Sequence, residues 1–161
     1  MMKTPTFPLV SICIPIYNGE AFLAEALASV KTQTYPNLEV VVSDDRSSDA
    51  SLALVEKFQQ EVDLPVRIFT HEPQGIGANW NHCVAKAKGQ YIKFLFQDDV
   101  LLPTCVEQMV EAFQQFPELA RRHPPAAFPD TGADASTPWT SCRSPTGPCP
   151  AAAGSSGHSR A

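Results

Sequence analysis

The chain has 161 residues, 43% of them hydrophobic, which suits one ordinary domain with a buried core. Its formal net charge of −5 gives no electrostatic reason to expect nucleic acid or an anionic membrane surface as a partner. No stretch approaches the roughly 20 apolar residues of a transmembrane helix, and the N-terminus MMKTPTFPLV lacks the apolar core of a signal peptide. We therefore expect a soluble, cytoplasmic protein without a transmembrane segment.

The composition changes after about Ala120. Residues 121–161 contain no Leu, Ile, Val, Met or Tyr and consist largely of Pro, Ala, Ser, Gly and Thr. Such a segment cannot bury enough apolar surface to offset the entropy lost on ordering. We therefore predict one ordered region at residues 8–120 and a low-complexity tail at residues 121–161, which is disordered or an out-of-frame extension.

The first half of the ordered region alternates strand and helix patterns. Leu9 to Ile16 is a nearly continuous apolar run, which predicts a strand buried on both faces. A helix from Ala21 to Gln33 follows, with one apolar stripe made of Phe22, Leu23, Ala26, Leu27 and Val30. Leu38 to Val42 is the second predicted strand. Ser47 or Ser48 is the expected cap of the next helix, whose inner face is Leu52, Val55 and Phe58.

The second half repeats this alternation. We predict a short strand at Val66 to Phe69, a helix from Gly77 to Lys88 closed by Gly89, and a strand at Tyr91 to Phe96. Pro103 suits the first turn of a last helix, whose inner residues are Val106, Met109, Val110 and Phe113. Strand-helix units with short connections predict an α/β fold, a parallel sheet between two layers of helices. Cys13, Cys83 and Cys105 fall in its apolar segments without metal-ligand spacing, which favours reduced, packed thiols.

Two acidic pairs follow predicted strands directly. Asp44 and Asp45 come after the second strand, and Asp98 and Asp99 come after the fourth. The carboxyl ends of parallel strands share one edge of the sheet, where open α/β sheets bind ligands. Adjacent carboxylates are tolerated best when a cation or hydrogen-bond donors neutralise them. The sequence therefore predicts a nucleotide and metal site at this edge.

Taken in order, three stretches resemble the nucleotide-sugar half of family 2 glycosyltransferases: VSICIPIYNGEAFLAEALASV, LEVVVSDDRSSDAS and GIGANWNHCVAKAKGQYIKFLFQDDVLLP. The resemblance covers roughly residues 8–119. It implies a GT-A, Rossmann-like half-domain and transfer of a sugar from a nucleoside diphosphate, of the UDP type, to an unidentified acceptor, usually with inversion. The nucleoside-diphosphate sugar is the implied partner.

The resemblance also implies which residues bind the nucleotide sugar: Pro15, Tyr17, Asn18, Asp44, Asp45, Asn81 and Asp98. The turn after the first strand would line the base pocket, although Pro15 equally suits a plain strand terminator. Ionised carboxylates accept hydrogen bonds, so Asp45 suits a uracil N–H or ribose hydroxyls. For Asp44 and Asp45 the alternative is a turn in which Asp49 and the serines cap the next helix.

Asp98 is the expected metal ligand, together with Asp99. A divalent ion held by a carboxylate can bridge the two phosphates, and hard oxygen ligands select Mn²⁺ or Mg²⁺. The family commonly shows Asp-x-Asp-Asp here, whereas this chain has Phe96-Gln97-Asp98-Asp99, so the first acid is lost. Trp80 stands where the family more often has Arg, and we expect it to pack. His71 and His82 lack metal-ligand spacing and are expected to be surface or hydrogen-bonded histidines.

Members of the family carry their general base in the C-terminal half of the domain. The residues after Ala120 do not resemble that half. The resemblance therefore implies a truncated donor-binding region with impaired catalysis and no assignable catalytic residue. Two alternatives remain open: a nucleotide-sugar-binding module without turnover, and a Mg²⁺-binding receiver-like module. The receiver is the less favoured, because no apolar strand after Asp98 ends in the Lys that receivers need.

Overall fold

The computed structural model describes residues 7–117; the predicted low-complexity tail at residues 121–161 lies outside them. The described residues form four strands and four helices in strict alternation. In chain order these are β1 (Val10–Ile16), α1 (Glu20–Lys31), β2 (Leu38–Asp44), α2 (Ser51–Glu61), β3 (Val66–Thr70), α3 (Ile76–Lys86), β4 (Tyr91–Phe94) and α4 (Cys105–Gln115). No helix among residues 7–117 is long and apolar enough to cross a membrane.

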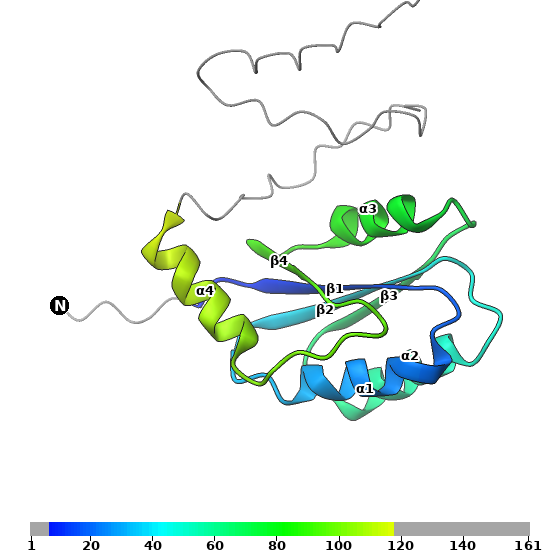
Figure 1. Ribbon diagram of the computed structural model, residues 1–161, viewed down its shortest axis with the longest axis horizontal. Coiled ribbons are helices and arrows are strands. Elements are labelled where there is room, and N and C mark those ends of the chain that lie inside the picture. Colours follow the sequence, from blue (N-terminus) through cyan, green and yellow to red (C-terminus); the bar gives the residue numbers. More distant parts are fainter. Residues whose placement is uncertain (1–6, 118–161) are drawn as a thin grey trace, which may run out of the picture. The chain divides into compact units, whose positions relative to one another are not determined.

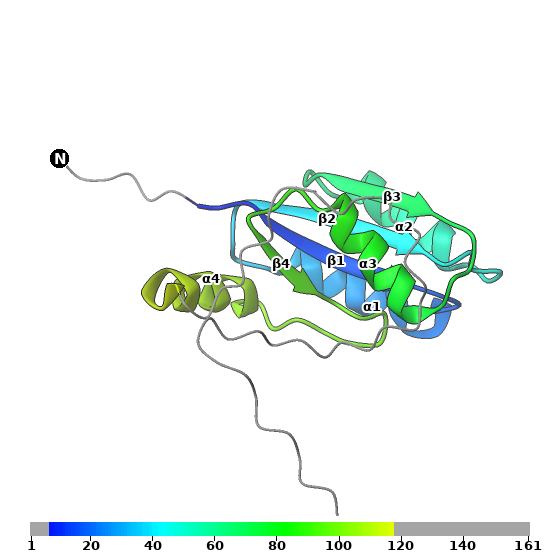
Figure 2. The same ribbon diagram turned by 90° about the horizontal axis from the view of Figure 1, so that it is seen from above.

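The four strands form one parallel sheet in the order β3-β2-β1-β4 (Figure 2). Helices α1 and α2 cover one face and α3 covers the other (Figure 1), so the predicted three-layer α/β architecture is confirmed. From β1 the chain first builds outward through β2 and β3, then returns to place β4 on the other side of β1. The strand order therefore reverses between β1 and β4, and ligands bind at such a switch point in open α/β sheets.

The central strands are buried because both of their faces are covered. All seven residues of β1 and all seven of β2 are buried. Ile12 and Val40 belong to the larger core cluster against α1 and α2, whereas Cys13 and Val41 pack with Cys83 of α3. The three described cysteines are free thiols, as predicted. A hydrogen bond with Cys83, together with burial, raises the pKa of Cys13 far above its usual range, so this thiol is unreactive.

The predicted starts of two helices and one residue of a predicted inner face were wrong. Helix α2 begins at Ser51 after Ala50, so neither Ser47 nor Ser48 caps it; a carboxylate oxygen of Asp49 accepts the Ser51 N–H instead. Helix α4 begins at Cys105, so Pro103 precedes the helix rather than lying in its first turn. In α1, Phe22 is exposed, although its spacing placed it on the inner stripe. A stripe drawn at helical spacing is wider than the surface that α1 buries here.

Gly89 does not close α3 as predicted. The helix ends at Lys86, and the Gly89 N–H donates to Ser11 Oγ at 2.8 Å as the chain approaches β4. A Cβ at Gly89 would come within 2.5 Å of the Ser11 backbone nitrogen. This position requires glycine because two backbones approach closely, not because a helix ends there. The fourth strand also ends at Phe94, two residues before the predicted end at Phe96.

Candidate functional site

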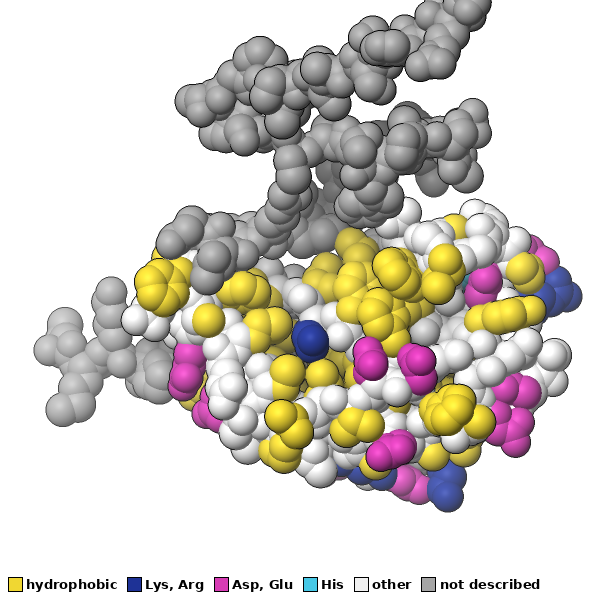
Figure 3. All heavy atoms as spheres, viewed as in Figure 1, with side chains coloured by type: hydrophobic (Ala, Val, Ile, Leu, Met, Phe, Trp, Pro, Cys, Tyr) yellow, Lys and Arg dark blue, Asp and Glu magenta, His cyan; other side chains and the backbone are white. Residues whose placement is uncertain are grey.

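A pocket of about 660 Å³ opens at the carboxyl edge of the sheet. Its walls come from the turn after β1, the residue after β2, the loop that leads into α3, one side of α3, and the segment after β4; they comprise Pro15, Ile16, Tyr17, Asp45, Pro73, Gly75, Ile76, Asn79, Trp80, Phe96, Gln97 and Asp98. Figure 3 shows hydrophobic side chains gathered over α3 and β4, with acidic side chains beside them. Of the nucleotide-binding residues expected from the sequence, the pocket brings together Pro15, Tyr17, Asp45 and Asp98.

Asp45 is a largely buried residue of the pocket wall. Its N–H donates to the Ile16 carbonyl at 3.0 Å, which joins the ends of β1 and β2. One carboxylate oxygen, Oδ1, accepts the Gln74 N–H at 3.2 Å and lies 3.5 Å from Nδ1 of His71. The side chain is 8% exposed yet forms part of the pocket wall. A largely buried carboxylate fixed through one oxygen can offer the other as a directed hydrogen-bond acceptor.

Asp44 and Asn18 instead build the turns behind the pocket. The Asp44 carboxylate accepts the Ser47 N–H at 3.0 Å and the Ser47 hydroxyl at 2.5 Å. Asn18 has φ 48°, which Asn tolerates better than most residues, and its Oδ1 accepts the Ser48 N–H at 2.8 Å. Neither Asp44 nor Asn18 lines the pocket. Asp44 therefore stabilises the turn after β2, which is the alternative to nucleotide binding that the sequence left open.

Gln97 links the segment after β4 to the turn after β1 by two hydrogen bonds. The sequence pattern did not predict this role. Oε1 of Gln97 accepts the Tyr17 N–H at 2.9 Å and its Nε2 donates to the Tyr17 carbonyl at 3.2 Å. The side-chain amide thus pairs with both backbone groups of one residue, as a residue of a neighbouring antiparallel strand would. A Cβ at Gly19 would lie 2.5 Å from Gln97 Oε1, so a larger residue there would displace the Gln97 side chain. The pair fixes the segment that carries Asp98.

The asparagine of α3 that reaches the pocket is Asn79, not Asn81. Asn79 is 3% exposed, and its Nδ2 donates to the Ile16 carbonyl at 3.0 Å. Asn81 is exposed and lies outside the pocket wall. Residues two apart on a helix do not share a face, whereas Asn79 shares a face with the buried Cys83 four positions later. That spacing was the signal by which the sequence could have identified Asn79.

Asp98 and Asp99 line different hollows. Asp98 lines the main pocket, whereas Asp99 borders a second hollow beside Leu101 and the start of α4. Within residues 7–117 no group of three or more His, Cys, Asp or Glu side chains could hold a metal ion. A hard divalent ion held by Asp98 would need its further oxygen ligands from a bound molecule or from water.

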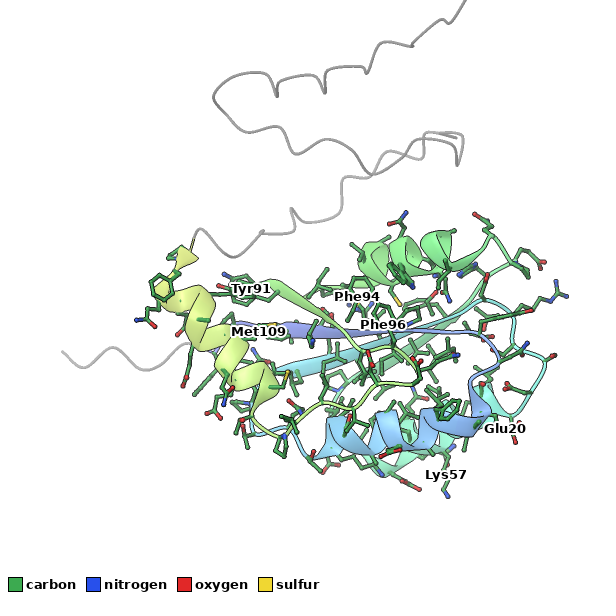
Figure 4. All side chains as sticks on the ribbon, in the orientation of Figure 1. Glu20, Lys57, Tyr91, Phe94, Phe96 and Met109 are labelled. Carbon is green, nitrogen blue, oxygen red and sulfur yellow. The ribbon has the colours of Figure 1, made fainter. Side chains whose placement is uncertain are left out.

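The two departures from the family pattern contact each other. The rings of Trp80 and Phe96 lie 4.9 Å apart between centroids, and Phe94 stacks on Phe96 at 5.9 Å. Figure 4 shows Phe94 and Phe96 at the end of β4, below α3. Trp80 contacts the Phe96 ring but is 37% exposed, and both Trp80 and Phe96 line the pocket. An aromatic pair thus occupies the positions where the family more often carries an Arg and an Asp.

The sequence model described as Glycosyl transferase family 2 matches residues 11–137. The chain belongs to glycosyltransferase family 2. It is 33% identical over 125 residues to the putative glycosyltransferase EpsH of Bacillus subtilis, which covers 78% of this chain and 36% of EpsH. It is 31% identical over 106 residues to a Campylobacter jejuni GalNAc(5)-diNAcBac-PP-undecaprenol beta-1,3-glucosyltransferase, covering 65% of this chain and 34% of that protein.

Solved structures of glycosyltransferases share the fold. S. aureus TarS in complex with UDP-GlcNAc superposes with a TM-score of 0.61 at 29% identity, over 66% of this chain and 31% of the TarS chain. The mannosyltransferase PcManGT of Pyrobaculum calidifontis, in complex with GDP-Man and Mn²⁺, gives a TM-score of 0.56 at 27% identity, over 59% of this chain and 29% of PcManGT. The chain thus spans about a third of the length of these relatives.

Proposed function

We propose that this family 2 chain binds a nucleoside-diphosphate sugar of the UDP type in the pocket between β1, β2 and β4. The observation that carries the proposal is the position of Asp45 and Asp98, which line one pocket from separate strand ends at the switch point of the sheet. The likeness to TarS, which has been solved with UDP and with UDP-GlcNAc, supports this choice of ligand.

In this proposal Asp45 accepts a hydrogen bond from the uracil N–H or from the ribose, beside Pro15 and Tyr17. Asp98 would hold Mn²⁺ or Mg²⁺ together with the diphosphate, and PcManGT, a structural relative, has been solved with Mn²⁺. When bound, such an ion offsets the charge that develops on the diphosphate leaving group. Asp99, which borders the other hollow, is not proposed as a ligand.

We propose sugar transfer as the activity of a full-length family member that contains this region. Inversion follows the family resemblance, and the acceptor stays unassigned. We assign no general base among residues 7–117, so the described region accounts for donor binding rather than for activation of the acceptor. Binding without turnover is the second candidate for this chain by itself. Family membership removes the support for a receiver-like module.

Calorimetric titration with UDP-GlcNAc, with and without Mn²⁺, tests the proposal. Asp98→Asn keeps the size of the side chain and removes its charge, so we expect it to abolish the Mn²⁺-dependent gain in affinity and leave metal-free binding nearly unchanged. Asp99→Asn is the matched control and should keep the gain. Wild-type protein that binds no UDP-GlcNAc under either condition would refute the proposed ligand. A persistent Mn²⁺ effect in Asp98→Asn would remove Asp98 from the metal site.

A further inference from the structure

The ring of His71 lies behind the pocket wall and makes a hydrogen bond through each nitrogen. His71 follows β3, and its side chain is 14% exposed. Its Nδ1 lies 2.8 Å from the Glu72 carbonyl oxygen. Its Nε2 lies 3.1 Å from Oδ1 of Asn79 on α3. The ring therefore bridges the loop that leads into α3 and α3 itself.

Both partners of the ring are acceptors. A carbonyl oxygen such as that of Glu72 cannot donate. The amide of Asn79 cannot be turned around either, because its Nδ2 donates to the Ile16 carbonyl at 3.0 Å and its oxygen must then face His71. A neutral imidazole has only one N–H and would leave a nitrogen lone pair facing an oxygen. Only the doubly protonated ring satisfies both hydrogen bonds.

The charged groups around His71 suit a cation at this position. Asp45 faces it from the end of β2, with Oδ1 3.5 Å from Nδ1. The carboxylate of Glu72 pairs with Arg46 at 2.5 Å, so Asp45 is the anion left to His71. From α3, the ring of His82 lies 4.6 Å away between centroids.

His82 remains neutral beside that cation. Its Nδ1 lies 2.7 Å from the Ser43 hydroxyl. Burial first, and then the nearby charges of His71 and Lys86, lower the pKa of His82 below its usual value. Of the two stacked histidines, His71 is the one whose two hydrogen-bond contacts require a doubly protonated ring.

We propose that His71 is a positioning residue of the donor site, which as an imidazolium fixes the Asp45 carboxylate and joins the loop before α3 to Asn79. The ligand in this inference rests on the proposed function. Loss of a proton from His71 leaves two oxygens competing for one N–H and removes the cation beside Asp45. Donor affinity should therefore be lower at alkaline pH than at acid pH.

The protonation of the ring can be measured without any ligand. Heteronuclear NMR of the 161-residue chain at about pH 7 should show both ring nitrogens of His71 protonated, and His82 neutral. A His71 ring with one unprotonated nitrogen at this pH overturns the inference, whatever the chain binds.

The coupling to the ligand is measured by the affinity for UDP-GlcNAc from about pH 5.5 to about pH 8.5, the range in which histidines ordinarily titrate. In this ligand the terminal phosphate of UDP is esterified to the sugar, so it lacks the ionisation that free UDP would show near neutral pH. We expect wild-type affinity to fall roughly tenfold across the range, since a charge-assisted hydrogen bond is lost. His71→Gln should bind weakly at every pH, with a flat profile, whereas the control His82→Gln should keep the wild-type slope.

The outcomes separate the two proposals. A flat wild-type profile overturns the inference about His71 and leaves the donor site in place. No UDP-GlcNAc binding at any pH refutes the proposed function, and the NMR measurement then decides the state of His71. If His71→Gln does not fold, as judged by circular dichroism, the wild-type profile and the His82→Gln control still decide the coupling.

Discussion

At the scale of single residues, Asp45 is the acceptor that the proposed uridine contact needs. We predict that Asp45→Ala weakens UDP-GlcNAc binding equally with and without Mn²⁺, because its partner is the nucleoside rather than the metal. Loss of one charge-assisted hydrogen bond should cost about 1.5–3 kcal/mol, or roughly tenfold to a hundredfold in affinity. Calorimetry measures this, with Asp98→Asn as the variant that should lose only the Mn²⁺-dependent part. Unchanged affinity in Asp45→Ala would take Asp45 out of the site.

The contact between Trp80 and Phe96 predicts that their substitutions are coupled. Phe96→Asp restores the acid that the family commonly has, but it places a carboxylate against an indole ring that now lies 4.9 Å from Phe96 between centroids. Adding Trp80→Arg replaces the apolar ring beside that carboxylate with a polar side chain. We expect the double variant to gain more Mn²⁺-dependent affinity than the two single variants together, with a coupling of about 0.5–3 kcal/mol for contacting residues. Strictly additive effects would show that the two positions act independently.

At the scale of elements, the pocket depends on how the segment after β4 is tied to the turn after β1. Gln97 makes that tie through both groups of its amide. We predict that Gln97→Ala reduces Mn²⁺-dependent UDP-GlcNAc affinity more than metal-free affinity, because Asp98 loses its fixed position. The loss should be about 1 kcal/mol for each hydrogen bond at most.

Gln97→Glu is the matched variant for this prediction. It keeps an acceptor for the Tyr17 N–H but places a carboxylate oxygen against the Tyr17 carbonyl, so we expect it to impair binding too. Equal Mn²⁺ dependence in wild type and Gln97→Ala would show that the amide pair does not position Asp98.

The strands were predictable from the sequence, whereas several connections were not. A strand depends on residues next to one another in the chain, but these connections depend on residues far apart in it. A buried strand such as β1 is specified by its own apolar run. The role of Gly89 depends on Ser11, 78 residues earlier, and that of Gln97 depends on Tyr17, 80 residues earlier. Of the candidate site, the family pattern led to Asp45 and Asp98. It could not identify His71, whose role depends on contacts with Asp45 and Asn79 that the fold creates.

At the scale of the whole molecule, a buried polar network holds the strands together away from the pocket. Glu39, near the start of β2, is 3% exposed. Its carboxylate accepts the Ser11 hydroxyl of β1 at 2.5 Å, the Lys88 N–H at 2.7 Å and Arg67 of β3 at 2.8 Å. Three strands and the connection after α3 therefore converge on one carboxylate. The pocket lies at the opposite, carboxyl edge of the sheet, so stability and ligand binding are separable here.

This network predicts how the stability of the fold depends on pH. Burial by itself would raise the pKa of Glu39, but the hydrogen bonds from Ser11, Lys88 and Arg67 outweigh it and hold the pKa below its usual 4.5. Because the unfolded chain then binds the proton more readily, the contribution of Glu39 is present above about pH 4.5 and is lost as the pH falls through the lower pKa of the folded state.

We predict that Glu39→Gln lowers the free energy of unfolding at about pH 7 by about 2–4 kcal/mol, because Arg67 is left partly buried without its anion. The variant should also lose less of its remaining stability than wild type when the pH is lowered to about 4. Urea unfolding at both pH values measures this, and UDP-GlcNAc affinity at neutral pH is the control that should stay unchanged. An equal loss of stability in acid for wild type and Glu39→Gln would show that other carboxylates, not Glu39, make the fold sensitive to acid.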